Sequence, residues 1–321
     1  MGRYILRRCL QAIPLLFLLT IAMFGLIHLL PGGPEAVLFN PHLTAQARAD
    51  LRLRMGLDDP IYIQYFKWLT SALTGNFGSS FVTNEPVSTV IGRAFPNTLE
   101  LFVSALVLAL VVAILLGVIS GVRQGTITDY ALTILAYAGI AMPVFLLGLL
   151  VDDLFGVALK WFPTSGTESV AVVFTNPFSA FLDHLWYLAL PMTVLAIAFI
   201  AGWSRYLRSS MIETVKQDYM RTARAKGVGP VALLFRHALR NALIPLITVV
   251  ALDFGSVAGG AAITEGVFAW HGMGLLFLDS LDRRNYPVLI AMLMIGAFFV
   301  VMFNLIADIL YGVMDPRIRY S

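Results

Sequence analysis

The charged residues of this 321-residue chain leave six long stretches that carry one formal charge between them. These stretches are 9–30, 101–122, 130–151, 185–204, 241–264 and 285–307. A helix needs about 20 apolar residues to cross the roughly 30 Å of bilayer hydrocarbon, and each stretch is long enough. Strands of about ten residues with alternating polarity would indicate a transmembrane barrel, and the sequence has none. The sequence therefore predicts one all-α membrane domain over 1–321, with six transmembrane helices.

The composition agrees with lipid as the solvent. Hydrophobic residues make up 59% of the chain and charged residues 13%, whereas soluble domains have about 45–50% and about 25%. The net charge of +3 is small and scattered, which argues against nucleic acid as a partner. Cys9 is the only cysteine, so an intrachain disulfide and a cysteine-based metal cluster are both excluded.

Lysine and arginine in short loops predict the orientation, because they favour the cytoplasmic side. Segment 205–240 holds eight basic residues against two acids, Glu213 and Asp218. The short loops 152–184 and 265–284 hold only Lys160, Arg283 and Arg284. We therefore expect 205–240 to be cytoplasmic and these two loops to be outer ones.

The same rule places residues 1–8 and the tail 308–321 in the cytoplasm, so both termini of this inner-membrane protein are predicted there. The first apolar run is too long for a signal peptide, and no small-residue cleavage site follows it. We expect it to be an uncleaved membrane anchor.

Segment 31–100 is predicted to be mostly extracytoplasmic, with short helices. Thr44 is a candidate cap for a helix through Met55 that Gly56 ends. The helical spacing of Gln64, Tyr65, Trp68 and Leu69 then suits an amphipathic helix at the membrane surface.

Small residues and prolines indicate how the membrane helices pack. Gly117-x-x-x-Gly121 and Gly255-x-x-x-Gly259 fit close helix–helix contacts, either within the chain or against a second subunit. Pro143 and Pro191 are expected to kink their helices, because proline removes a backbone donor.

Segment 205–240 reads as two short helices with a break between them. Gly227 suits the left-handed conformation that ends a helix, and Pro230 suits the first turn of the next one. The sequence therefore predicts a basic helix–turn–helix that projects from the membrane, although an ordinary positively charged loop has the same charge.

The residues of this segment resemble a known family. Asp218-Tyr-Met-Arg-Thr-Ala-Arg-Ala-Lys-Gly227, followed by Arg236-His-Ala-Leu-Arg-Asn-Ala-Leu-Ile-Pro245, is similar to the signature loop of ATP-binding-cassette (ABC) importer permeases. Arg221-Thr-Ala223 replaces an acidic residue and two alanines, and His237-Ala-Leu-Arg240 replaces the closing proline. Both departures are typical of the dipeptide, oligopeptide and nickel permease branch.

The resemblance covers nearly the whole chain. Further stretches similar to the branch are Arg3-Tyr-Ile-Leu-Arg-Arg8, Leu29-Leu-Pro-Gly32, Gly56-Leu-Asp-Asp-Pro60, Gly75-Asn-Phe-Gly-Ser-Ser80, Glu265-Gly-Val-Phe-Ala-Trp270, Asn285-Tyr-Pro287 and Asp315-Pro-Arg-Ile-Arg319. His271 stands where the family usually has proline, and Asn285 where it usually has aspartate.

The resemblance implies a type I importer fold and a transport role without chemistry in this chain. Segment 205–240 would dock on an ATPase subunit, and the candidate coupling residues are Arg221, Thr222, Ala223, Lys226, Gly227, Val228, Gly229, Pro230, Arg236, His237 and Arg240. The implied partners are a second, homologous permease subunit, two ATPase subunits and an extracytoplasmic substrate-binding protein. The chain has no Gly-x-x-x-x-Gly-Lys-Ser/Thr phosphate loop, so ATP and Mg²⁺ would bind in the ATPase subunits and this chain would hold no cofactor.

The substrate and its path stay open in the sequence. Di- and oligopeptides are favoured, with nickel or another small solute as the alternative. Asp253 is the one acid well inside a predicted span, so it could line the pathway together with Gly255 and Gly259, or it could be a packing residue.

Two other classes of function are weighed against this one. Asp253 would also suit an ion-coupled secondary carrier, but carriers usually show inverted repeats, and no repeat is visible. An intramembrane serine protease needs a serine and a histidine on facing helices, and His28 is the only histidine within a span. The five histidines are too scattered for a metal cluster.

Overall fold

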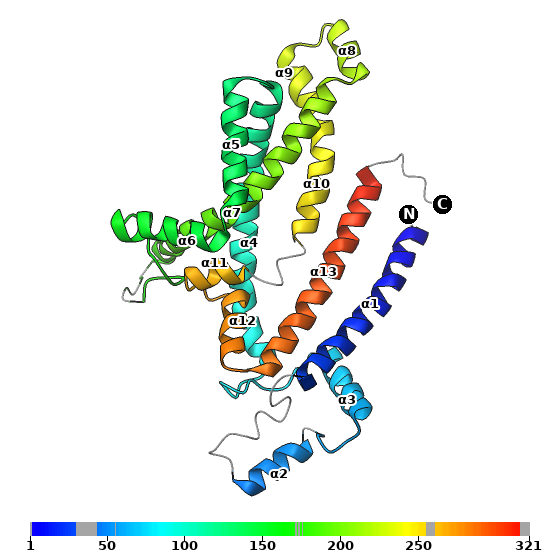
Figure 1. Ribbon diagram of the computed structural model, residues 1–321, viewed down its shortest axis with the longest axis vertical. Coiled ribbons are helices and arrows are strands. Elements are labelled where there is room, and N and C mark those ends of the chain that lie inside the picture. Colours follow the sequence, from blue (N-terminus) through cyan, green and yellow to red (C-terminus); the bar gives the residue numbers. More distant parts are fainter. Residues whose placement is uncertain are drawn as a thin grey trace.

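The computed structural model describes residues 2–29, 44–54, 56–170, 172, 174, 176–254 and 261–314 (Figure 1). All regular elements in these residues are helices, and one isolated bridge joins Ser79 and Pro86. The protein is therefore an all-α membrane protein, as predicted.

The helices follow one another with short connections. They are α1 (Gly2–Leu29), α2 (Ala45–Arg54), α3 (Ile61–Leu73), α4 (Val87–Val122), α5 (Ile127–Ala141), α6 (Val144–Val151), the π-helical η2 (Asp152–Ala158), α7 (Pro177–Val215), α8 (Asp218–Ala225), α9 (Pro230–Ala232), the π-helical η3 (Leu233–Leu239), α10 (Arg240–Phe254), α11 (Ala262–Val267), α12 (Met273–Asp282) and α13 (Tyr286–Met314).

Four helices of the described residues are long and apolar enough to cross a membrane. They are α4, α7, the continuous helix Pro230–Phe254 and Tyr286–Ile306 of α13. Helix α5 and the α6–η2 helix form a fifth candidate as a bent pair, and Leu10–Leu26 of α1 is a shorter apolar helix. The predicted count of six spans thus stays a prediction.

The predicted span 130–151 is not one straight helix. Helix α5 ends at Ala141, and the chain bends by 104° before α6 continues. Pro143 explains the break, because it disfavours helical geometry at the residue before it, and Met142 is indeed extended with φ −83° and ψ 121°. Pro191, in contrast, lies inside the unbroken helix α7.

Several helices extend beyond their predicted spans. Helix α4 begins at Val87 rather than at 101, and the predicted outer loop 265–284 contains helix α12. The gaps between charges mark where a helix is apolar, whereas the helix itself continues through charged residues such as Arg93 and Glu100.

Helices α4 and α7 form the core. A side chain at Gly117 would place its Cβ 2.8 Å from the Cβ of Leu207, and one at Gly121 would lie 2.7 Å from the Cβ of Met211. Neither position has room for one, so these glycines let the two backbones approach closely. The motif Gly117-x-x-x-Gly121 therefore packs within the chain. Gly255 and Gly259 lie outside the described residues.

A buried ion pair attaches α5 to this core. Asp129 is 1% exposed and accepts two hydrogen bonds from Arg208 of α7, to Nε at 2.7 Å and to Nη2 at 2.8 Å. Ser120 of α4 donates to the same carboxylate, and the Gly125 amide donates to it at 2.9 Å. The pair thus joins the α4–α5 turn to α7.

The opposite end of α4 is held by a second buried carboxylate. Glu265 of α11 accepts hydrogen bonds from the amides of Gly274 (2.7 Å) and Leu275 (3.1 Å) in the first turn of α12, and from the Thr98 hydroxyl of α4 (2.8 Å). Burial raises the pKa of Glu265, while these donors act in the opposite direction. Glu265 therefore caps α12 and fastens it to α4.

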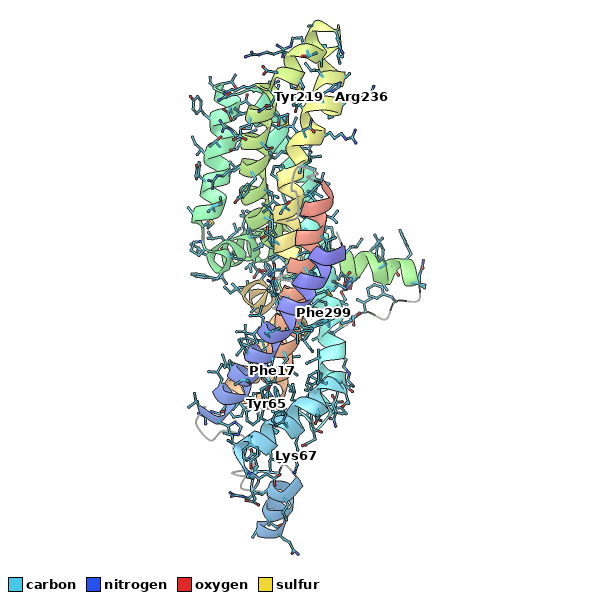
Figure 2. The ribbon with its side chains drawn as sticks, turned by 90° about the vertical axis from the view of Figure 1, so that its right-hand side faces the viewer. Phe17, Tyr65, Lys67, Tyr219, Arg236 and Phe299 are labelled. Carbon is cyan, nitrogen blue, oxygen red and sulfur yellow. The ribbon has the colours of Figure 1, made fainter. Side chains whose placement is uncertain are left out.

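Segment 31–100 contains the two predicted short helices. Helix α2 ends at Arg54, and Gly56 takes a left-handed φ of +63°. Helix α3 lies against α1, where the Tyr65 ring is 5.4 Å from Phe24 and 6.1 Å from Phe17 (Figure 2). The small segment thus packs on a membrane helix.

Candidate functional site

The chain between α7 and α10 forms a helical tip at the opposite end of the molecule from α12 (Figure 1). Helix α7 ends at Val215, α8 runs from Asp218 to Ala225, and the next helix begins at Pro230. The predicted helix–turn–helix is confirmed. We call residues 216–240 the coupling tip.

The turn inside the coupling tip is fixed by its backbone. Gly227 has φ +78°, its amide donates to the Arg224 carbonyl (3.0 Å), and the Val228 amide donates to Ala223 (3.2 Å). This pattern is a complete Schellman motif, which satisfies the last carbonyls of α8. Pro230 then occupies the first turn of α9, where its missing donor is not needed.

One face of α8 packs on the core. Met220 and Ala223 are buried in one cluster with Met211 of α7, Leu233 and Ala238. The Asn241 side chain of α10 also donates to the Tyr219 hydroxyl at 3.0 Å. Because α8 is held to both neighbouring helices, the coupling tip is attached firmly to the membrane domain.

The predicted coupling residues divide into two groups. Ala223 is buried, and Val228 and His237 are half-buried, so these three hold the tip together. The exposed ones are Arg221, Thr222, Lys226, Gly227, Gly229, Pro230, Arg236 and Arg240. The ion pair of Arg221 with Asp218 spans 3.6 Å between exposed groups, so it contributes little stability.

Three apolar residues of the tip escaped the sequence analysis. Tyr219 is 41% exposed, Val231 71% and Phe235 58%. Figure 2 shows Tyr219 and Arg236 together at the end of the molecule. The available signal was local, since Val231 and Phe235 lie four residues apart in a basic segment. Exposed aromatic and aliphatic side chains among arginines are typical of a protein interface.

Asp253 lies in the last turn of α10. Its Oδ2 accepts a hydrogen bond of 2.7 Å from Nε1 of the buried Trp203 on α7. The carboxylate is half-buried and therefore reaches both the core and the space beside it. Its predicted companions Gly255 and Gly259 are not among the described residues.

In the part of the chain that the structure describes, no three histidine, cysteine, aspartate or glutamate side chains gather in a way that could hold a metal ion.

Comparison with known proteins assigns the family. The family model described as "Binding-protein-dependent transport system inner membrane component" matches residues 113–320, and that of its N-terminal part matches 1–102. The chain belongs to this permease family. The resemblance to ABC importer permeases is thereby confirmed.

The permease is similar to curated proteins over its full length. It is 43% identical over 321 residues to the oligopeptide transport system permease protein AppB of Bacillus subtilis, and each chain is covered completely. It is 43% identical over 325 residues to a putative peptide permease protein of Brucella suis, and 37% identical over 322 residues to the glutathione transport system permease protein GsiC of Salmonella typhimurium, again with both chains covered completely.

Membership settles the coarse role. The chain is a multi-pass inner-membrane transport subunit of an ABC importer, a class of transporter that works with ATPase and substrate-binding components.

The permease should lose the order of its tip when Gly227 is replaced. We expect Gly227→Ala to cost about 1–2 kcal/mol, because a Cβ is unfavourable in the left-handed conformation. Gly229→Ala is the matched control, since Gly229 has φ −62° and open space around it. Hydrogen exchange of the amides at 218–228 measures the effect. Equal exchange in the two variants would contradict the role of the turn.

Proposed function

We propose that this permease moves peptides across the inner membrane in an ATP-driven importer and that its coupling tip docks on an ATPase subunit. The observation that carries the proposal is the combination of a firmly held helical tip with exposed Val231 and Phe235. A firmly held tip can transmit movement to the membrane helices, whereas a flexible loop would absorb it.

The chemistry of the coupling tip suits a protein groove. Val231 and Phe235 would be the anchors, since a few buried apolar side chains carry most of an interface's binding energy. Exposed Arg221, Lys226 and Arg236 would form a basic rim and steer the tip toward an acidic surface. When ATP closes the ATPase subunits, the tip and helix α7 would move as a unit and switch the membrane helices between two states.

The proposed assembly contains a second, homologous permease chain, two ATPase subunits and an extracytoplasmic substrate-binding protein. ATP and Mg²⁺ bind in the ATPase subunits, and this chain contributes movement without a catalytic site. Both termini and the coupling tip lie in the cytoplasm, as the charge distribution of the loops favours.

Peptides are the proposed substrate class. The names of the relatives, which refer to oligopeptide, peptide and glutathione transport, support this choice over nickel or another small solute. Asp253 would line the pathway and attract the amino group of a peptide, because a carboxylate in a membrane helix is costly unless it has a partner or a function.

The docking proposal predicts a loss of the ATPase subunit from the double variant Val231→Glu with Phe235→Glu. We expect affinity to fall at least about tenfold, since both anchors become charged. A pull-down of the tagged chain from mild detergent measures it. Val122→Glu with Ile127→Glu is the control, because these side chains are also exposed but lie on the α4–α5 turn.

The outcomes of the pull-down separate the classes of transporter. Full retention of the ATPase by the Val231/Phe235 variant would place docking elsewhere. A wild-type chain that retained no ATPase would overturn the importer proposal and favour an ion-coupled carrier.

The pathway proposal predicts that Asp253→Asn lowers peptide uptake at least about tenfold, because the charge that attracts the amino group is lost. An asparagine oxygen can still accept the Trp203 hydrogen bond, so the fold is expected to persist. ATP-driven uptake in vesicles with the complete importer measures the effect, and ATPase retention is the control. Unchanged uptake would make Asp253 a packing residue.

A further inference from the structure

A groove of about 390 Å³ lies between α5 and α7, away from the exposed apolar residues of the coupling tip. Its lining includes Thr133, Tyr137, Arg205, Tyr206, Arg208 and Ser209. Two guanidinium groups, several hydroxyls and two aromatic rings therefore meet in one place.

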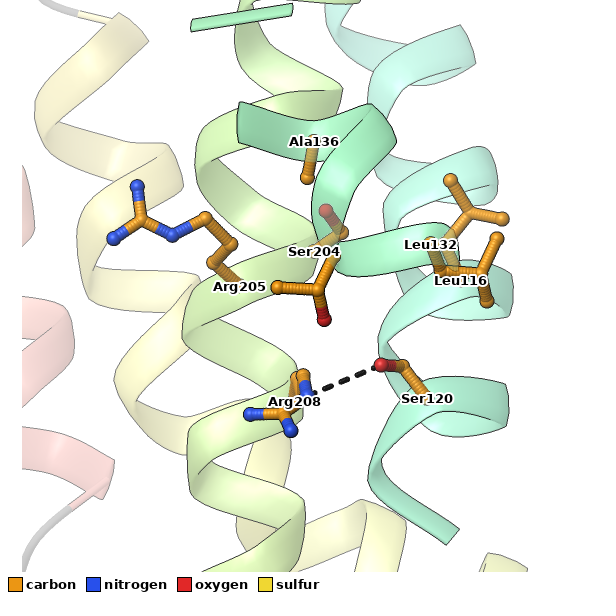
Figure 3. A pocket seen from close by; sticks show the side chains of 8 residues that line it. Leu116, Ser120, Leu132, Ala136, Ser204, Arg205 and Arg208 are labelled. Carbon is orange, nitrogen blue, oxygen red and sulfur yellow. Dashed lines mark hydrogen bonds between the residues drawn. The ribbon is translucent and has the colours of Figure 1, made fainter. Parts of the chain in front are cut away.

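The two arginines of the groove differ in what they contact. Arg208 is engaged by Asp129 and Ser120, so its charge is compensated. Arg205 forms no ion pair with any carboxylate of the described residues, and its guanidinium lies over the Tyr137 ring, 4.4 Å from the centroid. Figure 3 shows Arg208 reaching toward Ser120, whereas Arg205 points away from α4. The groove therefore has an uncompensated positive charge.

A hydroxyl without a partner adds to this charge. Thr133 Oγ1 is buried and has no hydrogen-bond partner in the described residues. Thr133 lines both the groove and a smaller pocket of about 10 Å³ beside it. Buried polar groups normally find partners, so this hydroxyl is available to an acceptor that enters from the groove.

The walls of the groove are fixed on two sides. Toward the membrane interior α5 and α7 touch, since a Cβ at Gly139 would lie 3.2 Å from the Cβ of Ala201. Toward the tip, the pair Arg208–Asp129 holds the two helices together. Between these contacts Gly202 has no atom within 4 Å of an added Cβ, so the groove is open there.

The position of the groove is that of a lipid headgroup. Arg205 is the first charged residue after the uncharged stretch 185–204. Tyr137 and Tyr206 are both more than half exposed, at 53% and 56%, and tyrosine is enriched at the level of the headgroups. Basic pockets between membrane helices bind anionic lipid headgroups.

We infer that the α5–α7 groove binds the phosphate of an anionic phospholipid, with Arg205 as its main contact and Thr133 as a hydroxyl donor. The acyl chains would leave the groove along the apolar outer face of the bundle. The inference does not depend on the docking of the coupling tip.

Lipid binding to the purified importer tests the inference, by native mass spectrometry with phosphatidylglycerol and phosphatidylcholine in competition. Wild type should prefer phosphatidylglycerol, and Arg205→Gln should lower that preference about fivefold, the effect expected for one basic residue near a headgroup. Gly202→Leu should lower the binding of both lipids by filling the groove.

Two variants serve as controls. Arg123→Gln removes one exposed basic residue outside the groove, and Gly202→Ala adds only a methyl group where there is room. Both should bind lipid as wild type does. An equal loss in Arg123→Gln would mean that net charge alone decides binding, which would overturn the inference.

Two further outcomes would also overturn it. Competition by inorganic phosphate as strong as that by phosphatidylglycerol would identify a site for free anions. Binding to the isolated chain, but not to the assembled importer, would show that a partner subunit covers the groove.

Discussion

The close contact between α4 and α7 is the constraint on which the rest of the structure depends. In a bilayer no hydrophobic force draws helices together, so association relies on close packing and on polar contacts. Gly117 and Gly121 supply the packing, because a side chain at either position would overlap with α7. Ala105, Ala109 and Ala113 continue the same buried stripe. A larger residue on this stripe would separate the two helices that carry every other element of the domain.

Buried polar contacts then attach the remaining helices to this core. Arg208 and Asp129 hold α5 at one end, and Glu265 with Thr98 holds α12 at the other. Breaking a buried ion pair by removing one partner typically costs about 3–5 kcal/mol, because an uncompensated charge remains. The coupling tip continues directly from α7 and packs its Met220 against the same core. A force applied to the tip therefore reaches α4 and α5 without passing through a flexible joint.

The sequence could predict what local rules decide. Gly227 and Pro230 follow known preferences at helix ends, so the break in the coupling tip was predictable, and the resemblance of Asp218–Gly227 identified the family. Contacts between distant residues were not predictable. Asp129 and Arg208 lie 79 residues apart, and Gly117 fits a contact within the chain as well as one between subunits. Pro143 predicted a kink, but the bend of 104° depends on the packing of α6. Exposure of Val231 and Phe235 required the fold.

The most direct test of this account is the distance between two spin labels in the assembled importer, one at Arg123 on the α4–α5 turn and one at Arg224 on α8. Replacing Cys9 with serine leaves only the two introduced cysteines. The account predicts the same distance with and without ATP, because the tip, α7 and α4 move as one body. A distance that changes when ATP binds would show that α8 moves independently of the core, and it would contradict the central claim.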